Sequence, residues 1–353
     1  MWMLNNQTPF AAERTWVRDK NGAEVWLVAV KGTFNILPDG TTIPAEQQEE
    51  VVIAPEFFGD PQSSSLLNDT DLPHKKLATD VLIQGHAYAP EGNPVTKLSV
   101  GFKVANIQKV LHITGDRLWL DSIGGVVSSD PQAFIKMPLT YERAFGGMDL
   151  TDEDEKKHDW EVRNPAGCGF ATKAEHLIGK PVPNIEDPND LMTYWKQRPK
   201  PVGFGPIAGH WFPRVTLAGT YDENWEKTRQ PLLAEDFDER YYQSVPEDQQ
   251  VSGYLKGGET VQLYNLTPDG KFQFHLPRIF LAFTTNFDDG TSENHRAVLH
   301  TVILKPDEKK VVLVWHTHLP CHYKVLKLNN TNIRLKRPEL GSKQVRASYE
   351  LTT

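Results

Sequence analysis

Apolar and polar positions alternate over several short segments of this chain, the pattern of a β-strand with one buried face. Residues 25–30 instead form a continuous apolar run, VWLVAV, which is typical of a strand buried on both sides. Residues 79–88 and 110–114 are further predicted strands. The alternation is clearest in one segment, where every second residue is apolar: Leu98, Val100, Phe102 and Val104.

Two hairpins are predicted near the C-terminal end. The strings VQLYNL and KFQFHL flank Thr267-Pro268-Asp269-Gly270, in which proline presets φ and glycine accepts a positive φ. A second pair, HTVILK and VVLVWH, flanks the turn string PDEKK. Strands from both ends of the chain therefore predict a mainly β protein with antiparallel, β-sandwich-like layers.

The middle of the chain has a different composition. Between residues 164 and 213, 14 of 50 positions are Gly or Pro, about twice the average of the chain, so long ordered loops are expected there. A short helix is predicted around residues 188–196, and the acidic stretch 149–159 is interpreted as an exposed loop. We expect one integrated domain over 1–353, with β-rich lobes at about 1–150 and 255–335 and a loop-rich segment at about 150–254.

Composition and charge narrow the function. The chain has 353 residues, 39% hydrophobic and 24% charged, with a formal net charge of −8. This acidic balance disfavours a nucleic-acid binder, and the basic run from Lys324 to Arg346 is interpreted as a solvated segment. The longest apolar runs are far shorter than the roughly 20 residues that span a bilayer. No basic and then apolar leader opens the sequence, so a cytoplasmic protein with no membrane partner is expected.

Histidines form the sharpest chemical cluster, in the string HTHLPCH. Alternate residues of a strand share a face, so His316 and His318 could bind zinc together with His322. A strand that ends on polar residues gives the same pattern, and this interpretation is favoured over a metal site.

Other candidates for catalysis are weaker. Cys168 has no base or cationic neighbour in the sequence, so tight packing is favoured over nucleophilic chemistry. The carboxylate pairs Glu186/Asp187 and Asp236/Asp238 could act on a glycan, but adjacent acids in loops usually cap turns. No nucleophile elbow, metalloprotease or phosphate-loop motif is present. Most of the nine tryptophans are expected in the core, and those of the loop-rich middle on a partner surface or carbohydrate platform.

Several long strings resemble a bacterial family that has long been labelled only as a domain of unknown function. They include LNNQTPFAAERTWVRDKNGAEVWLVAVKGTF near the start, GDPQSSSLLNDTDLPHKKLATDVLIQGHAYAP at 59–90 and MPLTYERAFGGMD at 137–149. NPAGCGF at 164–170 and VPNIEDP at 182–188 continue the match. The resemblance covers roughly residues 1–290, and the genes of this family lie in type VI secretion clusters, often beside PAAR-like spike-tip proteins.

The resemblance implies an adaptor or chaperone without an active site or cofactor. Such a protein is expected to bind and stabilise a cognate toxin effector, or its PAAR-like domain, and to help load it onto the VgrG–PAAR spike. A glycan-active enzyme, a carbohydrate-binding protein and a metal-binding protein that uses the C-terminal histidines remain the alternatives. The positions that match the family and could either contact a partner or hold the loops are Asp80, Arg117, Trp119, Arg143, Asn164, Asn184, Glu186, Trp211, Arg214 and Trp225.

Overall fold

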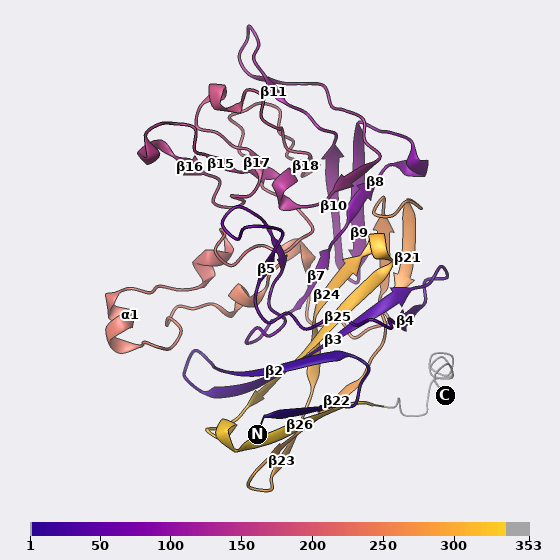
Figure 1. Ribbon diagram of the computed structural model, residues 1–353, viewed down its shortest axis with the longest axis vertical. Helices are drawn as coiled ribbons and strands as arrows, with labels where there is room; N and C mark the ends of the chain where they lie inside the picture. Colours follow the sequence, from indigo (N-terminus) through magenta and orange to yellow (C-terminus); the bar gives the residue numbers. More distant parts are fainter. Residues whose placement is uncertain (1, 337–353) are drawn as a thin grey trace.

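The computed structural model describes residues 2–336, so the end of the basic run that reaches Arg346 lies outside the described part. The fold is mainly β, which confirms the predicted class, and strands from both ends of the chain pair in the same sheets (Figure 1). Within residues 2–336, no helix is long and apolar enough to cross a bilayer.

The largest sheet has seven strands and combines the two ends of the chain. Its order is β19-β7-β24-β25-β3-β2, with β4 paired to β3. The central strand β3 is buried along nearly its whole length, as its apolar run predicts. The bounds are β2 (Ala11–Arg18), β3 (Glu24–Ile36), β4 (Thr42–Pro44), β7 (Thr79–Ile83), β19 (Gln250–Val251), β24 (Ala297–Lys305) and β25 (Lys310–Pro320).

Two further sheets complete the framework. A five-stranded sheet has the order β18-β10-β9-β20-β21, and a four-stranded sheet has the order β1-β26-β22-β23. The first contains β9 (Lys97–Val104), β10 (Ile107–Thr114), β18 (Ile185–Glu186), β20 (Thr260–Tyr264) and β21 (Lys271–His275). The second contains β1 (Met3–Asn6), β22 (Leu281–Phe287), β23 (Ser292–His295) and β26 (Leu328–Leu335).

Both predicted hairpins are present, as β20–β21 and β24–β25. Most pairs are antiparallel; β7–β24 and β1–β26, which join strands from opposite ends of the chain, are parallel, as is the short pair of β14 (Phe145–Gly146) with β17 (Cys168–Gly169). The predicted helix around residues 188–196 is wrong, since that stretch is a loop. Side chains fix its backbone there: Glu186 accepts a hydrogen bond from the amide of Met192, and Gln197 accepts one from the amide of Thr193.

The loop-rich segment, like the connections between the strands of the three sheets, carries only short elements. The one α-helix of residues 2–336, α1 (Glu223–Thr228), lies in the loop-rich segment and begins after Asp222, whose side chain accepts a hydrogen bond from the backbone amide of Trp225. The short strands are β5 (Glu56–Phe57), β6 (Leu66–Asn68), β8 (His86–Tyr88), β11 (Trp119–Leu120), β12 (Val127–Ser128), β13 (Lys136–Pro138), β14 (Phe145–Gly146), β15 (Met148–Asp149), β16 (Asp159–Trp160) and β17 (Cys168–Gly169). The 3₁₀ helices are η1 (Pro90–Gly92), η2 (Tyr141–Arg143), η3 (Glu155–Lys157), η4 (Ala174–Leu177), η5 (Arg214–Leu217), η6 (Glu239–Tyr242), η7 (Glu247–Gln249), η8 (Pro306–Glu308) and η9 (Val325–Lys327).

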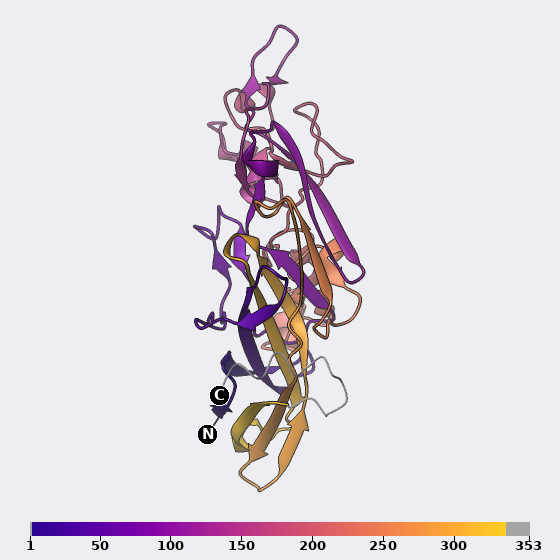
Figure 2. The same cartoon turned by 90° about the vertical axis from the view of Figure 1, so that its right-hand side faces the viewer.

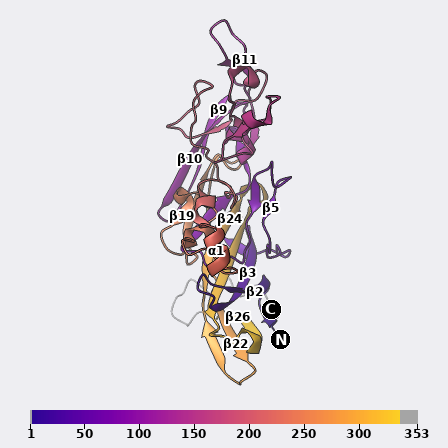
Figure 3. The ribbon, with the colours of Figure 1, turned by 90° about the vertical axis from the view of Figure 1, so that its left-hand side faces the viewer.

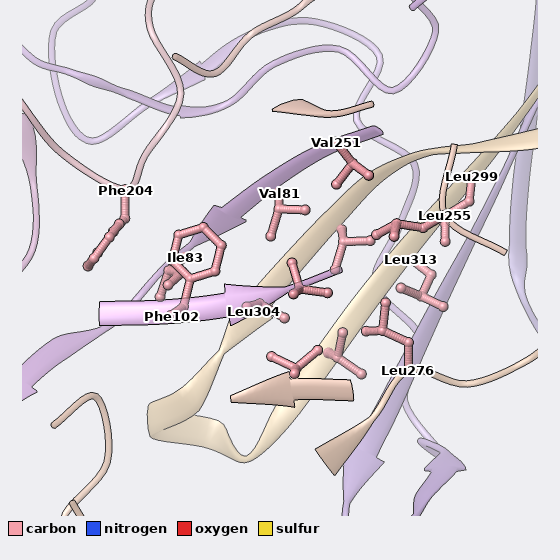
Figure 4. Close-up of a cluster of buried hydrophobic side chains, with 14 of the residues drawn as sticks. Val81, Ile83, Phe102, Phe204, Val251, Leu255, Leu276, Leu299, Leu304 and Leu313 are labelled. Atoms are coloured by element: carbon pink, nitrogen blue, oxygen red, sulfur yellow. The ribbon is translucent and has the colours of Figure 1, made fainter. Parts of the chain in front are cut away.

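The main core lies between the seven-stranded and five-stranded sheets. In Figure 4, Ile83 of β7 and Leu304 of β24 lie near Phe102 of β9, and Val81 and Leu313 belong to the same cluster; all five side chains are buried. Phe204, from the loop-rich segment, packs edge-on against Phe102 with ring centroids 5.6 Å apart. The loop-rich segment is therefore anchored in the same core as the sheets.

The molecule is elongated and narrow when viewed from the side (Figure 2). In the opposite side view, α1 and β5 face the viewer in front of the seven-stranded sheet (Figure 3). The loop-rich segment therefore covers one side of the framework and leaves the four-stranded sheet at one end.

Candidate binding groove

A hollow of about 660 Å³ opens on the loop-rich side of the molecule. Five of its lining side chains are large, apolar and exposed, which is unusual for one place on a protein surface. We call it the Trp160 hollow. Its lining consists of Pro61, Gln62, Met148, Trp160, Val162, Pro165, His210, Phe212 and Val215.

Three segments of the chain build this hollow. Met148 and Trp160 are directly opposite each other in the β15–β16 hairpin, so their side chains leave the same face. The amide of Phe212 donates to the carbonyl oxygen of Val162, at 3.0 Å, and this bond joins the second segment to the first. Trp160 is 50% exposed and Phe212 is 43% exposed, so both rings are available to a partner.

Asn164 fixes the backbone that leads into the hairpin. Its buried amide group donates to the carbonyl oxygens of Tyr141 and Phe145, at 2.8 and 2.9 Å. Gly146 lies against it with φ at 153°, and a Cβ there would be 2.1 Å from the carbonyl oxygen of Asn164. Only glycine fits this approach. Asn164, a predicted partner residue, thus supports the hollow from behind.

A second hollow of about 600 Å³ adjoins the first and shares His210 with it. We call it the Tyr242 hollow and the two together the groove. Phe57, Leu66, Leu72 and Tyr241 supply much of its wall, and Arg18 and Arg214 supply its positive charge. Arg214 is held on three sides: it donates to the carbonyl oxygens of Tyr241 and Ile207 and, at 2.6 Å, to the carboxylate of Asp69.

Apart from Arg18 and the Arg214–Asp69 ion pair, three titratable side chains along the groove stay uncharged near neutral pH: His210, His74 and Tyr242. Partial burial lowers the pKa of His210 at the junction and that of His74 in the Tyr242 hollow. Burial also raises the pKa of Tyr242 to about 12. Apolar contact and neutral hydrogen-bonding groups therefore dominate the floor of the groove.

A separate cluster unites four of the predicted residues at the base of the loop-rich segment. Glu186 is buried and accepts from the guanidinium of Arg117 at 2.9 Å. Arg143 donates to the side chains of Asn184 and Asp116, each at 3.0 Å. Arg117 also donates to the carbonyl oxygen of Pro183. These bonds join the end of β10 to the loops that follow, so this cluster stabilises the loops.

The three predicted tryptophans have different surroundings. Trp119 is fully buried in a small second core that also contains side chains of the loop-rich segment, such as Leu177 and Met192. Trp211 is buried beside the groove, where its ring is 6.2 Å from that of His210 and packs edge-on against Tyr141. Trp225 is partly buried on α1 and donates to the carbonyl oxygen of Leu232. All nine tryptophans lie in the described residues, and the other eight are more buried than Trp160, which is 50% exposed, so they form no flat aromatic platform.

Asp80 belongs to a buried polar network on the face of the seven-stranded sheet opposite the main core. Its carboxylate accepts hydrogen bonds from the ammonium group of Lys76 and from the side-chain amide of Gln243, both at 2.6 Å. It also accepts from the backbone and hydroxyl of Ser244, at 2.8 and 3.1 Å. Lys76 in turn donates to Thr301 of β24. The network fastens the segments around residues 76 and 244, which flank the Tyr242 hollow, to the sheet.

The histidine cluster divides between the sheet and the surface. His316 is buried on β25, and burial lowers its pKa to about 3. His318 lies on the same face, with its ring 4.8 Å from that of His74. His322 lies beyond β25 in an exposed turn with φ at 45°. Among residues 2–336, no three His, Cys, Asp or Glu side chains are placed to hold a metal ion.

The remaining catalytic candidates have structural partners. Burial raises the pKa of Cys168 to about 12, which removes the thiolate that a nucleophile needs. Asp236 accepts from the backbone and hydroxyl of Thr220, and Asp238 accepts from Arg240. These hydrogen bonds lower the pKa of both carboxyl groups, opposite to the raised value of a glycosidic general acid.

The sequence interpretation identified only part of the groove. Arg214 lines it, while Trp211 and Asn164 support it from behind. Met148 and His210 were missed, because the meeting of His210 with the β15–β16 hairpin depends on loops far apart in the chain. The available signal was the string HWFPR at 210–214, in which aromatic side chains follow one another within a Gly/Pro-rich stretch.

Comparison with known proteins identifies one family. The family model described as "Uncharacterized protein conserved in bacteria (DUF2169)" matches residues 21–316, most of the chain. No curated protein and no solved structure matches this chain.

Proposed function

This chain belongs to the bacterial family DUF2169, and from that premise we propose that it is a type VI secretion adaptor or chaperone. It binds and stabilises a cognate toxin effector, or its PAAR-like domain, and helps to load it onto the VgrG–PAAR spike. The adaptor works by binding without turnover. It acts in the cytoplasm, where the effector is made.

The groove is the observation that carries this proposal. Five exposed, large apolar side chains converge in the Trp160 hollow alone. Contiguous apolar surface of this kind marks a site where another molecule excludes water. A secreted effector must keep its own apolar segments soluble until they reach the spike. A groove that covers such a segment performs this task without any reaction.

Rigid support adds to the case. Asn164 fixes the β15–β16 hairpin, Arg214 fixes the wall of the Tyr242 hollow, and the Asp80 network fastens its flanks. A preformed site loses less conformational entropy when it binds than a flexible one. Removing a central aromatic anchor from such a site costs about 2 kcal/mol or more, roughly a 30-fold loss of affinity.

Co-expression with the proteins encoded by neighbouring genes tests the proposal. Each candidate effector carries the affinity tag, and the complex is followed by size-exclusion chromatography. We expect one effector to co-purify with this protein and to become insoluble or degraded when this protein is absent. If none of the neighbouring gene products forms a complex, the proposal is refuted.

Matched variants connect the complex to the groove. The double variant Trp160→Ala/Phe212→Ala removes the two exposed rings and should abolish co-purification. Tyr323→Ala/Leu326→Ala removes two side chains that are also exposed, at 86% and 68%, but lie outside the groove. This control should bind as the parent does. Equal losses in both variants would argue against the groove as the binding site.

A further inference from the structure

The hairpin segment from β15 to β16, residues 149–159, is strongly acidic, and we call it the rim of the Trp160 hollow because it begins and ends beside the lining residues Met148 and Trp160. Six acidic residues and two lysines lie between Met148 and Trp160, the two residues whose side chains line the hollow from this hairpin. Glu153, Glu155 and Asp159 are exposed and form no ion pair with any side chain in residues 2–336. The rim therefore carries negative charge that the protein itself does not neutralise.

The second side of the hollow adds to this charge. Asp60 immediately precedes the lining residues Pro61 and Gln62. It is exposed, and within the described chain its side chain accepts only a backbone hydrogen bond, from the amide of Gln62. Acidic groups thus flank the hollow from two separate segments.

Nearby positive charges are mostly occupied. Lys157 and Lys173 both contact the carboxylate of Asp152, at 3.4 and 2.8 Å, and Arg163 pairs with Glu161 at 2.7 Å. Lys156 alone adds an exposed positive charge to the hairpin without an ion pair to a described residue. The excess on the rim is therefore acidic, and no charged side chain lines the Trp160 hollow itself, whereas Arg18 and Arg214 lie in the adjoining Tyr242 hollow.

We propose that the occupant of the Trp160 hollow is an apolar segment of a partner protein that is flanked by Lys or Arg residues. This inference rests on the proposed function and specifies the chemistry of the partner. Apolar side chains of the segment cover Trp160 and Phe212, and its cations reach Glu153, Glu155, Asp159 and Asp60. Charge complementarity between rim and flanks selects the partner and orients it.

Charge also argues against a second copy of this chain as the occupant. The protein has a formal net charge of −8, and a symmetric contact through the groove would place two acidic rims together. Like charges across an interface repel, whereas a basic segment gains from both the floor and the rim.

Three labelled 18-residue peptides test this inference with the full-length protein. All have leucines at helical spacing, and the polar positions are Lys in one, Gln in the second and Glu in the third. Fluorescence anisotropy should show the Lys peptide binding at least 10-fold more tightly than the Gln peptide, and the Glu peptide binding most weakly. The difference should shrink as NaCl rises from about 50 to 500 mM, because salt screens exposed charges.

Protein variants locate the effect. The rim reversal Glu153→Lys/Glu155→Lys/Asp159→Lys should reverse the order of the peptides. The control Glu46→Lys/Glu91→Lys/Glu293→Lys makes the same change in net charge at exposed acids away from the β15–β16 hairpin, near β4, in η1 and on β23 (Figure 1). It should leave the order unchanged. The double variant Trp160→Ala/Phe212→Ala should weaken the binding of all three peptides. The inference is overturned if the parent protein shows no preference for the Lys peptide, or if the two charge reversals have equal effects on peptide binding.

The outcomes separate this inference from the proposed function. If a neighbouring effector binds through the groove but the peptides show no charge preference, the function stands and the basic partner is wrong. If the Lys peptide binds selectively but no neighbouring protein does, the partner chemistry stands and the secretion role fails. Concentration-dependent self-association that Trp160→Ala abolishes would assign the groove to a second copy and overturn the inference.

Discussion

Replacing Asp80 with asparagine should strongly destabilise the protein, although the two side chains have nearly the same shape. Asp80 is fully buried, and its carboxylate is the counterion of Lys76, which is 3% exposed at the side chain. Asp80→Asn leaves no cavity. It does leave the ammonium group of Lys76 inside the protein without its opposite charge.

The structure sets the size of the effect. Removing one partner of a buried ion pair costs about 3–5 kcal/mol, because the remaining charge stays out of water. For a chain of this length that loss lowers Tm by about 4–7 °C. The double variant Lys76→Met/Asp80→Asn removes both charges, so it should be more stable than Asp80→Asn alone.

Thermal and urea unfolding of the three proteins, followed by tryptophan fluorescence and circular dichroism, measures these differences. Glu223→Gln is the matched control. It removes one partner of the ion pair between Glu223 and Lys227, which are both largely exposed, so no measurable change in the unfolding free energy is expected. An Asp80→Asn variant within about 1 kcal/mol of the parent would refute the reasoning. So would a double variant that is less stable than Asp80→Asn.

Three further outcomes follow from other parts of the fold. His316 binds a proton near pH 3 when folded and near its usual 6.5 when unfolded, so the unfolded chain takes up more protons as pH falls through this window and stability is lost. At pH 5 the free energy of unfolding should be about 2 kcal/mol lower than at pH 7.5. Urea titrations of His316→Asn should show a smaller dependence of the unfolding free energy on pH, and an unchanged dependence would contradict the role given to His316. Burial raises the pKa of Cys168 to about 12 and that of Cys321 to about 11, so a thiol-specific disulfide reagent at pH 8 should modify neither cysteine quickly until denaturant is added. Gly146→Ala should destabilise the β15–β16 hairpin and weaken effector binding, since its Cβ meets the Asn164 carbonyl, whereas Gly124→Ala, with nothing within 4 Å, should behave as the parent.

Local pattern was sufficient for many strands. The alternation at residues 98–104 and the apolar run at 25–30 correspond to β9 and β3, because burial of one or both faces leaves a direct trace in the sequence. The turn string TPDG likewise marked the β20–β21 hairpin. Each of these signals lies within about a dozen residues.

Long-range pairing and the groove had no such signal. The parallel pair of β7 with β24 joins Thr301 to Asp80, more than 200 residues apart, and nothing near either residue indicates the other. The predicted helix at 188–196 failed because side chains such as Glu186 hold that backbone as a loop. The meeting of Met148 with His210 in one hollow depends on several such loops together.

The position of β3 between β2 and β25 has a consequence during protein synthesis. One neighbour, β2, precedes β3 directly, but the other ends at Pro320, 284 residues after Ile36. At roughly 5–20 residues per second, the ribosome needs about 15–60 s to supply it. Throughout that interval the most apolar strand of the nascent chain has an unpaired edge, which invites association with other chains. A ribosome that stops before β25 therefore leaves an aggregation-prone fragment, and this fold depends on rapid completion of its own translation or on a factor that covers the strand meanwhile.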